Sequence, residues 1–170
     1  MAGKVAWRFA KLLGIYRQVG RLLDRAGPRR LPPMTDNPDL HLVVNGTRVD
    51  AEERQRSVYV FRLPSSPKRV MIASREAVPA EFGIARDPRS LGVALRQPAV
   101  RQGAEFILLD ADDERLTAGF HAYEPSDRLW TDGYAALPAA AFARFDKGAE
   151  VMLHLGGATR YPDYRDRVAA

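Results

Sequence analysis

The sequence contains no cysteine and no long apolar run. The first absence excludes a disulfide framework, thiolate catalysis and zinc sites with cysteine ligands. The second excludes a transmembrane helix, which needs ~18–20 consecutive apolar residues. Residues 12–16, the longest uncharged stretch near the start, are too few for the apolar region of a signal peptide. We therefore expect a protein in the cytoplasm or peripheral at the inner face of the membrane.

Several motifs of catalysis are missing as well. There is no HxH or HExxH spacing, no Gly-rich phosphate loop and no GxSxG elbow. The acidic run Asp110–Glu114 lacks the spacing and the glycine of an EF-hand loop, which favours a solvated turn over a calcium site. The sequence thus predicts no metal site, no cofactor and no enzyme. A carboxylate-dependent, glycan-active enzyme remains the weaker alternative, since it requires two carboxylates ~5–10 Å apart across a cleft.

The net charge of +5 is unevenly distributed along the chain. Residues 1–35 contain eight basic groups and one acidic group, whereas the rest contains 18 basic and 20 acidic groups. A nucleic-acid-binding domain spreads its basic residues over a folded face. Because the excess lies in one leading segment, we expect no nucleic-acid partner.

That segment, residues 1–27, predicts a basic amphipathic helix over residues 4–26. Apolar residues at 3,4 spacing form one stripe, and arginines recur every four residues on the other side. Gly27 and Pro28 provide the stop signal. The residues expected to contact a membrane or a partner are Val5, Trp7, Phe9, Leu12, Leu13, Tyr16, Val19, Leu23, Arg17, Arg21 and Arg25.

Three surfaces could receive this helix. Its apolar stripe could dock on the chain's own β domain or on a second copy in a homo-oligomer. Its basic residues and Trp7 also suit an anionic membrane surface. The third possibility is a groove on another protein subunit.

Residues 28–39 form a proline-rich linker, and the hydrophobic period then changes to two. Asn45-Gly46 predicts a hairpin with a type I′ turn. Short strands separated by turn signals indicate a mainly β protein, an antiparallel β-sandwich or jelly-roll-like domain over residues 40–157, with a C-terminal tail over 158–170. The expected strands are 40–44, 47–49, 57–63, 68–74, 91–96, 105–110, 134–137 and 149–155. The segment 78–89 is expected to be an irregular crossover, 97–104 a turn and 138–145 a short helix.

The segment 119–137 combines aromatic and hydrogen-bonding side chains more densely than any other. In a β domain such a combination is typical of a ligand site that stacks on sugar rings and binds their hydroxyl groups. Trp130 could instead be a core residue, and the carboxylates could cap turns. The candidate ligand-binding residues are His121, Tyr123, Glu124, Asp127, Trp130, Asp132 and Tyr134.

Four segments in this order, residues 41–50, 58–64, 70–95 and 119–138, resemble a small accessory β domain. That domain trails bacterial Hint-domain (Hedgehog/intein-like) proteins and some polysaccharide-related glycosyltransferases. The resemblance covers about residues 40–157, and its most specific pieces are SREAVPAEFG, DPRSLGVAL and the GFH…LWTDG…LP block. It implies a β-sandwich attached to envelope or glycan machinery and brings no catalytic residues. The Hint domain and its nucleophilic cysteine are missing.

The prediction is therefore a non-catalytic module that binds a glycan or a protein partner and is tethered by its helix to a membrane surface or an assembly. The alternative is a structural subunit of a larger complex whose helix docks into partner subunits.

Overall fold

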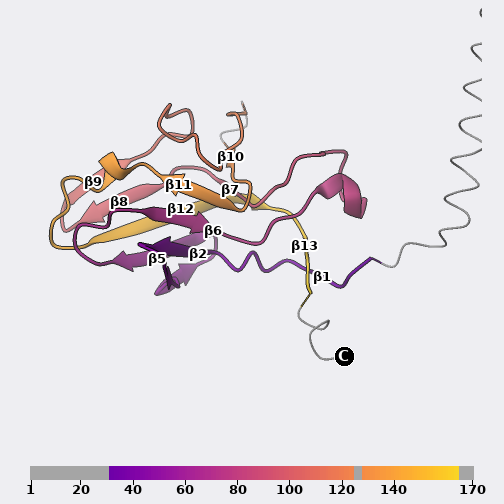
Figure 1. Cartoon of the computed structure of the whole chain (residues 1–170), viewed down its shortest axis with the longest axis horizontal. Coiled ribbons are helices and arrows are strands. Elements are labelled where there is room, and N and C mark those ends of the chain that lie inside the picture. The colour runs from indigo at the N-terminus through magenta and orange to yellow at the C-terminus, as the bar shows by residue number, and fades with distance from the viewer. Residues whose placement is uncertain (1–30, 125–127, 165–170) are drawn as a thin grey trace, which may run out of the picture. The chain divides into compact units, whose positions relative to one another are not determined.

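The computed structural model describes residues 31–124 and 128–164. The chain divides into two compact units, residues 1–32 and 33–170. The predicted amphipathic helix over 4–26 and its contact residues lie outside the described part. Within that part the structure consists of strands and two short 3₁₀ helices, η1 (Pro79–Phe82) and η2 (Ala139–Ala141). All strand pairs are antiparallel. The prediction of a mainly β protein is confirmed (Figure 1).

One sheet has four strands in the order β11-β6-β2-β3. Its members are β11 (Tyr134–Leu137), β6 (Val70–Ala73), β2 (His41–Val44) and β3 (Thr47–Val49). The predicted hairpin joins β2 to β3, and both turn residues have positive φ, 53° at Asn45 and 89° at Gly46. Asparagine and glycine tolerate this conformation better than other residues, so the turn sequence specifies the register of the hairpin.

The second sheet has seven strands and is arranged around the long strand β12 (Ala149–Ala158). β5 and then β4 lie on one side of β12, while β8 and β7 pair with successive parts of its other side. The register of β12 against β7 shifts between Leu155 and Gly157. The other members are β4 (Glu53–Gln55), β5 (Val58–Leu63), β7 (Val93–Leu95), β8 (Ala99–Gln102), β9 (Glu105–Leu108) and β10 (Leu129–Trp130).

Side chains from both sheets meet in one hydrophobic core. Leu42 and Ile72 come from the four-stranded sheet, and Phe61, Val93 and Leu153 come from the seven-stranded sheet. All five are fully buried, and each such side chain contributes about 1.5–3 kcal/mol through removal from water. The alternating strands in the sequence therefore place their apolar faces against each other.

The expected boundaries of the β domain differ from the structure at both ends. Strand β1 (Met34–Thr35), inside the predicted linker, pairs with β13 (Tyr161–Pro162), inside the predicted tail. Tyr161 is fully buried, and its hydroxyl group donates a hydrogen bond of 2.7 Å to the carbonyl oxygen of Gly92. Residues of the tail are thus part of the fold because the aromatic ring fills the interior and its polar end finds a partner.

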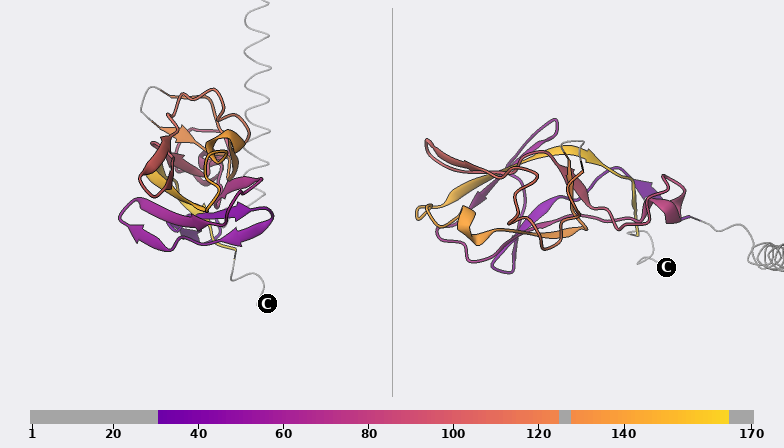
Figure 2. Two further views of the ribbon diagram at one scale, coloured as in Figure 1. Left: turned by 90° about the vertical axis from the view of Figure 1, so that its left-hand side faces the viewer. Right: turned by 90° about the horizontal axis from the view of Figure 1, so that it is seen from above.

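The segments between the strands also differ in detail. Residues 99–102, expected within a turn, form strand β8. The crossover 78–89 contains η1, which ends at Gly83 with a φ of 67°. The helix expected over 138–145 is reduced to the single 3₁₀ turn η2 after Pro138. Figures 1 and 2 place η1 and the β1–β13 pair at one end of the β domain and the tip of the β8–β9 hairpin at the other.

No helix within residues 31–124 and 128–164 is long and apolar enough to span a membrane.

Candidate functional site

A pocket of about 440 Å³ opens beside Trp130, and we call it the Trp130 pocket. Trp130 comes from β10, while the residues around it come from the segment after β1, the crossover before β7, the loop before β10, the end of β12 and the turn that follows it. Its apolar lining is formed by Pro79, Ile84, Ala85, Leu91, Trp130 and Ala158. Its polar lining is formed by Asp36, Asp87, Arg89, Glu124, Thr159 and Arg160.

The polar side is organised by a turn with the sequence Asp87-Pro88-Arg89. The carboxylate of Asp87 accepts hydrogen bonds from the Arg89 backbone N–H at 2.9 Å and from the guanidinium, with Nη2 at 2.6 Å. The same Nη2 lies 2.7 Å from Oε1 of Glu124. Arg89 therefore joins the crossover to the loop before β10, and its two carboxylate partners hold the guanidinium in one orientation.

This geometry changes the protonation of Asp87. Hydrogen bonds from the Arg89 side chain and backbone, together with the positive charge of Arg89 and a smaller contribution from His121, lower the pKa of Asp87 from 3.8 to about 2. The same contacts, first with Asp87 and then with Glu124, raise the pKa of Arg89. Asp87 is thus an ionised acceptor at neutral pH.

Trp130 is half-buried on the outer face of the second sheet. Its cross-strand partner on β7 is Ala94, which in turn pairs with Gly157 on β12. Residues directly opposite each other in antiparallel strands point to the same face. Trp130 therefore stands beside the small residue Ala94, with Gly157 one strand further on the same face.

His121 supports the pocket without lining it. Its Nε2 donates a 2.7 Å hydrogen bond to the carbonyl oxygen of Ser90, because a carbonyl can only accept. Its backbone N–H donates to the carbonyl oxygen of Trp130 at 2.9 Å. His121 consequently fixes the loop before β10 against the segment that carries Arg89.

Tyr123 lines a separate, more polar pocket of about 520 Å³, which we call the Tyr123 pocket. The side chain is 43 % exposed. Within this pocket the amide of Gln97 donates a 2.6 Å hydrogen bond to Asp110. The other lining residues are Arg96, Ala111 and Asp112. The consecutive residues Tyr123 and Glu124 therefore line different pockets.

The remaining candidates have other positions. Oδ1 of Asp132 accepts the backbone N–H of Tyr134 at 2.9 Å, so this carboxylate stabilises the turn before β11. Tyr134 is exposed at the start of β11, in the four-stranded sheet. Neither residue lines the Trp130 pocket or the Tyr123 pocket. Asp127 lies outside the described residues.

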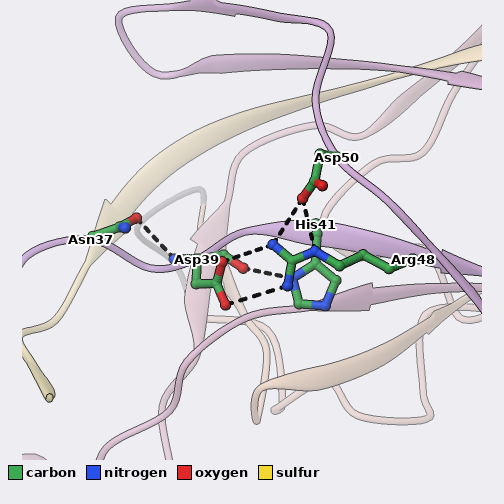
Figure 3. Close-up of polar contacts among 5 residues, drawn as sticks. All are labelled: Asn37, Asp39, His41, Arg48 and Asp50. Atoms are coloured by element: carbon green, nitrogen blue, oxygen red, sulfur yellow. Dashed lines mark hydrogen bonds and ion pairs between the residues drawn. The ribbon is translucent and has the colours of Figure 1, made fainter. Parts of the chain in front are cut away.

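A further polar cluster surrounds Arg48 on the β2–β3 hairpin (Figure 3). The guanidinium contacts Asp39 and Asp50, each at 2.8 Å, and this pairing lowers the pKa of Asp39. His41 donates through Nδ1 to the carbonyl oxygen of Asp39 at 2.7 Å, and Asn37 accepts the backbone N–H of Asp39. None of the five residues lines the Trp130 pocket. The cluster fixes the chain entering β2 to its own hairpin.

Two further pockets in the described part of the chain contain no tryptophan, tyrosine or phenylalanine. The larger measures about 620 Å³ and lies beside His154. The smaller measures about 410 Å³ and lies around Arg62, Arg101 and Lys147. Within residues 31–124 and 128–164, no group of three or more histidines or carboxylates is arranged to hold a metal ion. The Trp130 pocket combines an aromatic ring with oriented charged groups, so it is the candidate binding site.

Sequence reasoning brought Glu124 and Trp130 into one candidate site but missed Asp87, Arg89 and Arg160. A local signal for the first two exists, since an Asp two residues before an Arg can accept both the backbone and the side-chain donors of that Arg. Nothing local indicates that Glu124 meets this turn. Comparisons of the chain with protein-family models, curated proteins and solved structures found no match.

Proposed function

We propose that this domain is a non-catalytic β-sandwich module that binds a glycan in the Trp130 pocket. One observation carries the proposal: a half-buried tryptophan lines the same pocket as Arg89, whose guanidinium is held by Asp87 and Glu124. A sugar ring presents a C–H face that packs on an aromatic ring and hydroxyl groups that need donors and acceptors. The pocket offers both within one concavity.

The ion pairs favour recognition because they fix the polar groups before a ligand arrives. Arg89 has contacts to two carboxylates, so less side-chain freedom is lost when a hydroxyl group binds. Asp87 and Glu124 retain further acceptor positions for hydroxyl donors. Such pre-organised, directional groups provide orientation, while Trp130 and Leu91 provide apolar contact area.

The electrostatics of Asp87 do not suit the general-acid role in glycoside hydrolysis. A glycosidase requires one carboxyl group with a raised pKa that acts as general acid. The pKa of Asp87 is instead lowered to about 2 by Arg89, so this group has no proton to give at neutral pH. The helix predicted over residues 4–26 would tether the module to a membrane surface or an assembly. The proposal also includes a relation between this domain and the accessory domains of Hint proteins.

A protein partner is the second candidate, because of strand β9. Among the described strands β9 pairs only with β8, and it exposes Phe106 (63 %) and Leu108 (47 %) on one face. An edge strand with exposed apolar side chains is suited to pairing with another chain. This surface favours the role of a structural subunit in an assembly.

Trp130 allows a direct test of glycan binding. The chain has two tryptophans, so Trp7→Phe leaves the pocket residue as the only indole. A glycan array selects the ligand, and titration of that ligand into the Trp7→Phe protein should change the fluorescence of Trp130. Replacing Trp130 with alanine in the full chain should weaken binding at least about tenfold, as for buried aromatic anchors elsewhere.

The matched control is Arg115→Gln, because Arg115 forms the same kind of turn with Asp113 and lines neither pocket. Circular dichroism and the melting temperature show whether each variant is folded. Unchanged affinity in a folded Trp130→Ala protein would exclude this pocket, and the absence of any glycan ligand would favour the protein-partner role.

A further inference from the structure

Two arginines lie between the Trp130 pocket and the Tyr123 pocket. Arg128 directly precedes β10. It lies two residues before Trp130 and therefore on the same face of the sheet. Arg96 follows β7, shares the face of Ala94 and lines the Tyr123 pocket. Leu129 and Leu95 pair in antiparallel strands. Arg128, before Leu129, and Arg96, after Leu95, therefore lie next to each other at the same end of this pair.

The two side chains cross the third strand, β12, where it has glycines. A Cβ atom at Gly156 would lie 3.0 Å from Cγ of Arg96 and 3.2 Å from Cγ of Arg128. At Gly157, a Cβ would lie 3.7 Å from Nη1 of Arg128. The absence of side chains at these two positions therefore gives both arginines room to lie together over the strand.

Among the residues that the structure describes, no acidic side chain neutralises either guanidinium. Arg89 is paired with Asp87 and Glu124, and Arg160 lies 3.4 Å from Asp36. Among the described residues, no carboxylate forms an ion pair with Arg96 or Arg128. Two adjacent like charges repel each other, and an anion placed between them removes that repulsion. The planar guanidinium matches a carboxylate through paired hydrogen bonds.

From this geometry we infer that the site is selective for an acidic oligosaccharide, whose uronate carboxylate binds between Arg96 and Arg128. The sugar on Trp130 occupies the Trp130 pocket, and the chain continues toward Tyr123. This inference rests on the proposed glycan binding and names the class of glycan. Because Arg96 and Arg128 are exposed, the preference for the acidic ligand weakens as the salt concentration rises.

The test compares oligosaccharides that differ only in charge. Calorimetry measures the affinity of the full chain for a set of uronate-containing oligosaccharides and for their carboxyl-reduced, neutral counterparts of equal length. We expect the acidic member of the recognised pair to bind about tenfold more tightly at low salt, which is the effect of a hydrogen bond to a charged group. In Arg96→Gln/Arg128→Gln the two members should bind equally.

The control is Arg144→Gln, which removes one positive charge from an exposed residue after η2 that lines neither pocket. This variant should keep the full preference for the acidic ligand. Equal affinity of the parent for both members of each pair overturns the inference but leaves glycan binding intact. A preference that survives in the double variant also overturns it. If no glycan of either kind binds, the proposed function itself fails.

Discussion

The domain contains the same turn twice, once inside the candidate site and once outside it. In Asp87-Pro88-Arg89 the backbone N–H of the arginine lies 2.9 Å from Oδ1 of the aspartate, and its Nη2 lies 2.6 Å from Oδ2. In Asp113-Glu114-Arg115 the corresponding distances are also 2.9 and 2.6 Å. Both aspartates have their pKa lowered to about 2, chiefly by the side-chain hydrogen bond from the arginine.

What differs is the surroundings of the two arginines. Arg89 has a second carboxylate partner, Glu124, and lines a pocket with Trp130. Arg115 has Asp113 as its only ion-pair partner among the described residues and lines neither pocket. A strongly lowered pKa is therefore a product of the local turn and does not by itself mark a site. The functional assignment depends on the aromatic ring and the second carboxylate beside one of the turns.

The largest effect is expected from removing the support behind the Arg89 turn. Tyr161 is fully buried and bonds the carbonyl oxygen of Gly92, which follows the pocket residue Leu91. Tyr161→Ala should lower the free energy of unfolding by about 3–5 kcal/mol, since it leaves a cavity and an unpaired carbonyl. Tyr161→Phe keeps the ring and should cost about 1 kcal/mol. Urea denaturation measures both values, and an alanine variant as stable as the parent would contradict the burial of the C-terminal strand.

Replacing the arginine of each turn tests directly whether the two turns differ in function. Arg89→Gln should weaken glycan binding at least about tenfold, because Asp87 and Glu124 lose the cation that orients them. Arg115→Gln should leave affinity unchanged. Each variant should lower stability by less than about 1 kcal/mol, as is usual for part-exposed ion pairs. Calorimetric titration and thermal denaturation provide the two readouts. Equal losses of affinity in both variants would remove the distinction between the turns.

The class of fold could be predicted from the sequence because its signals are local. Asn45-Gly46 specifies a hairpin by its own backbone preferences, and alternating apolar residues specify strands with one buried face. Strands β1 and β13 have two residues each, too few for any periodicity. They form through pairing between Met34 and Pro162, which are distant in sequence. The burial of Tyr161 in a polar tail follows from that pairing.

In the candidate site, too, local features could be predicted from the sequence and contacts between distant segments could not. Glu124 and Trp130 stand out by composition within residues 119–137, and they do line one pocket. Asp87 and Arg89 lie in a segment that reads as an irregular crossover. Their contact with Glu124 depends on how that crossover meets the loop before β10, where His121 bonds Ser90. Non-local contacts of this kind leave no periodic pattern, and so the arginine of the site was missed.

A smaller effect is expected at the cluster around Arg48, which resembles the Arg89 cluster in having two carboxylates. Arg48 and Asp39 are about half exposed, with 47 % of the Arg48 side chain accessible, and Asp50 is 70 % exposed. Arg48→Gln should lower stability by no more than about 1 kcal/mol. Glycan affinity should stay at the parent value, because the cluster lines no part of the Trp130 pocket. A loss of affinity in this variant would extend the site to the β2–β3 hairpin.

Protonation of the aspartates in the two turns is expected to change the free energy of unfolding least. Their titration is nevertheless the sharpest test of the two turns. Each folded-state pKa, about 2, lies below the usual value of 3.8. The stabilisation from each aspartate is therefore fully present above pH 3.8 and is lost as the pH falls through about 2. Because the pairs are part-exposed, each should contribute less than about 1 kcal/mol.

NMR spectroscopy of the side-chain carboxyl groups can follow both residues in one experiment. In the parent, Asp87 and Asp113 should titrate together. In Arg89→Gln the pKa of Asp87 should rise toward its usual value while that of Asp113 stays low, and Arg115→Gln should produce the reverse. If Asp87 kept its low pKa without Arg89, other groups would set that pKa, and His121, which also contributes to lowering it, would be the first to examine.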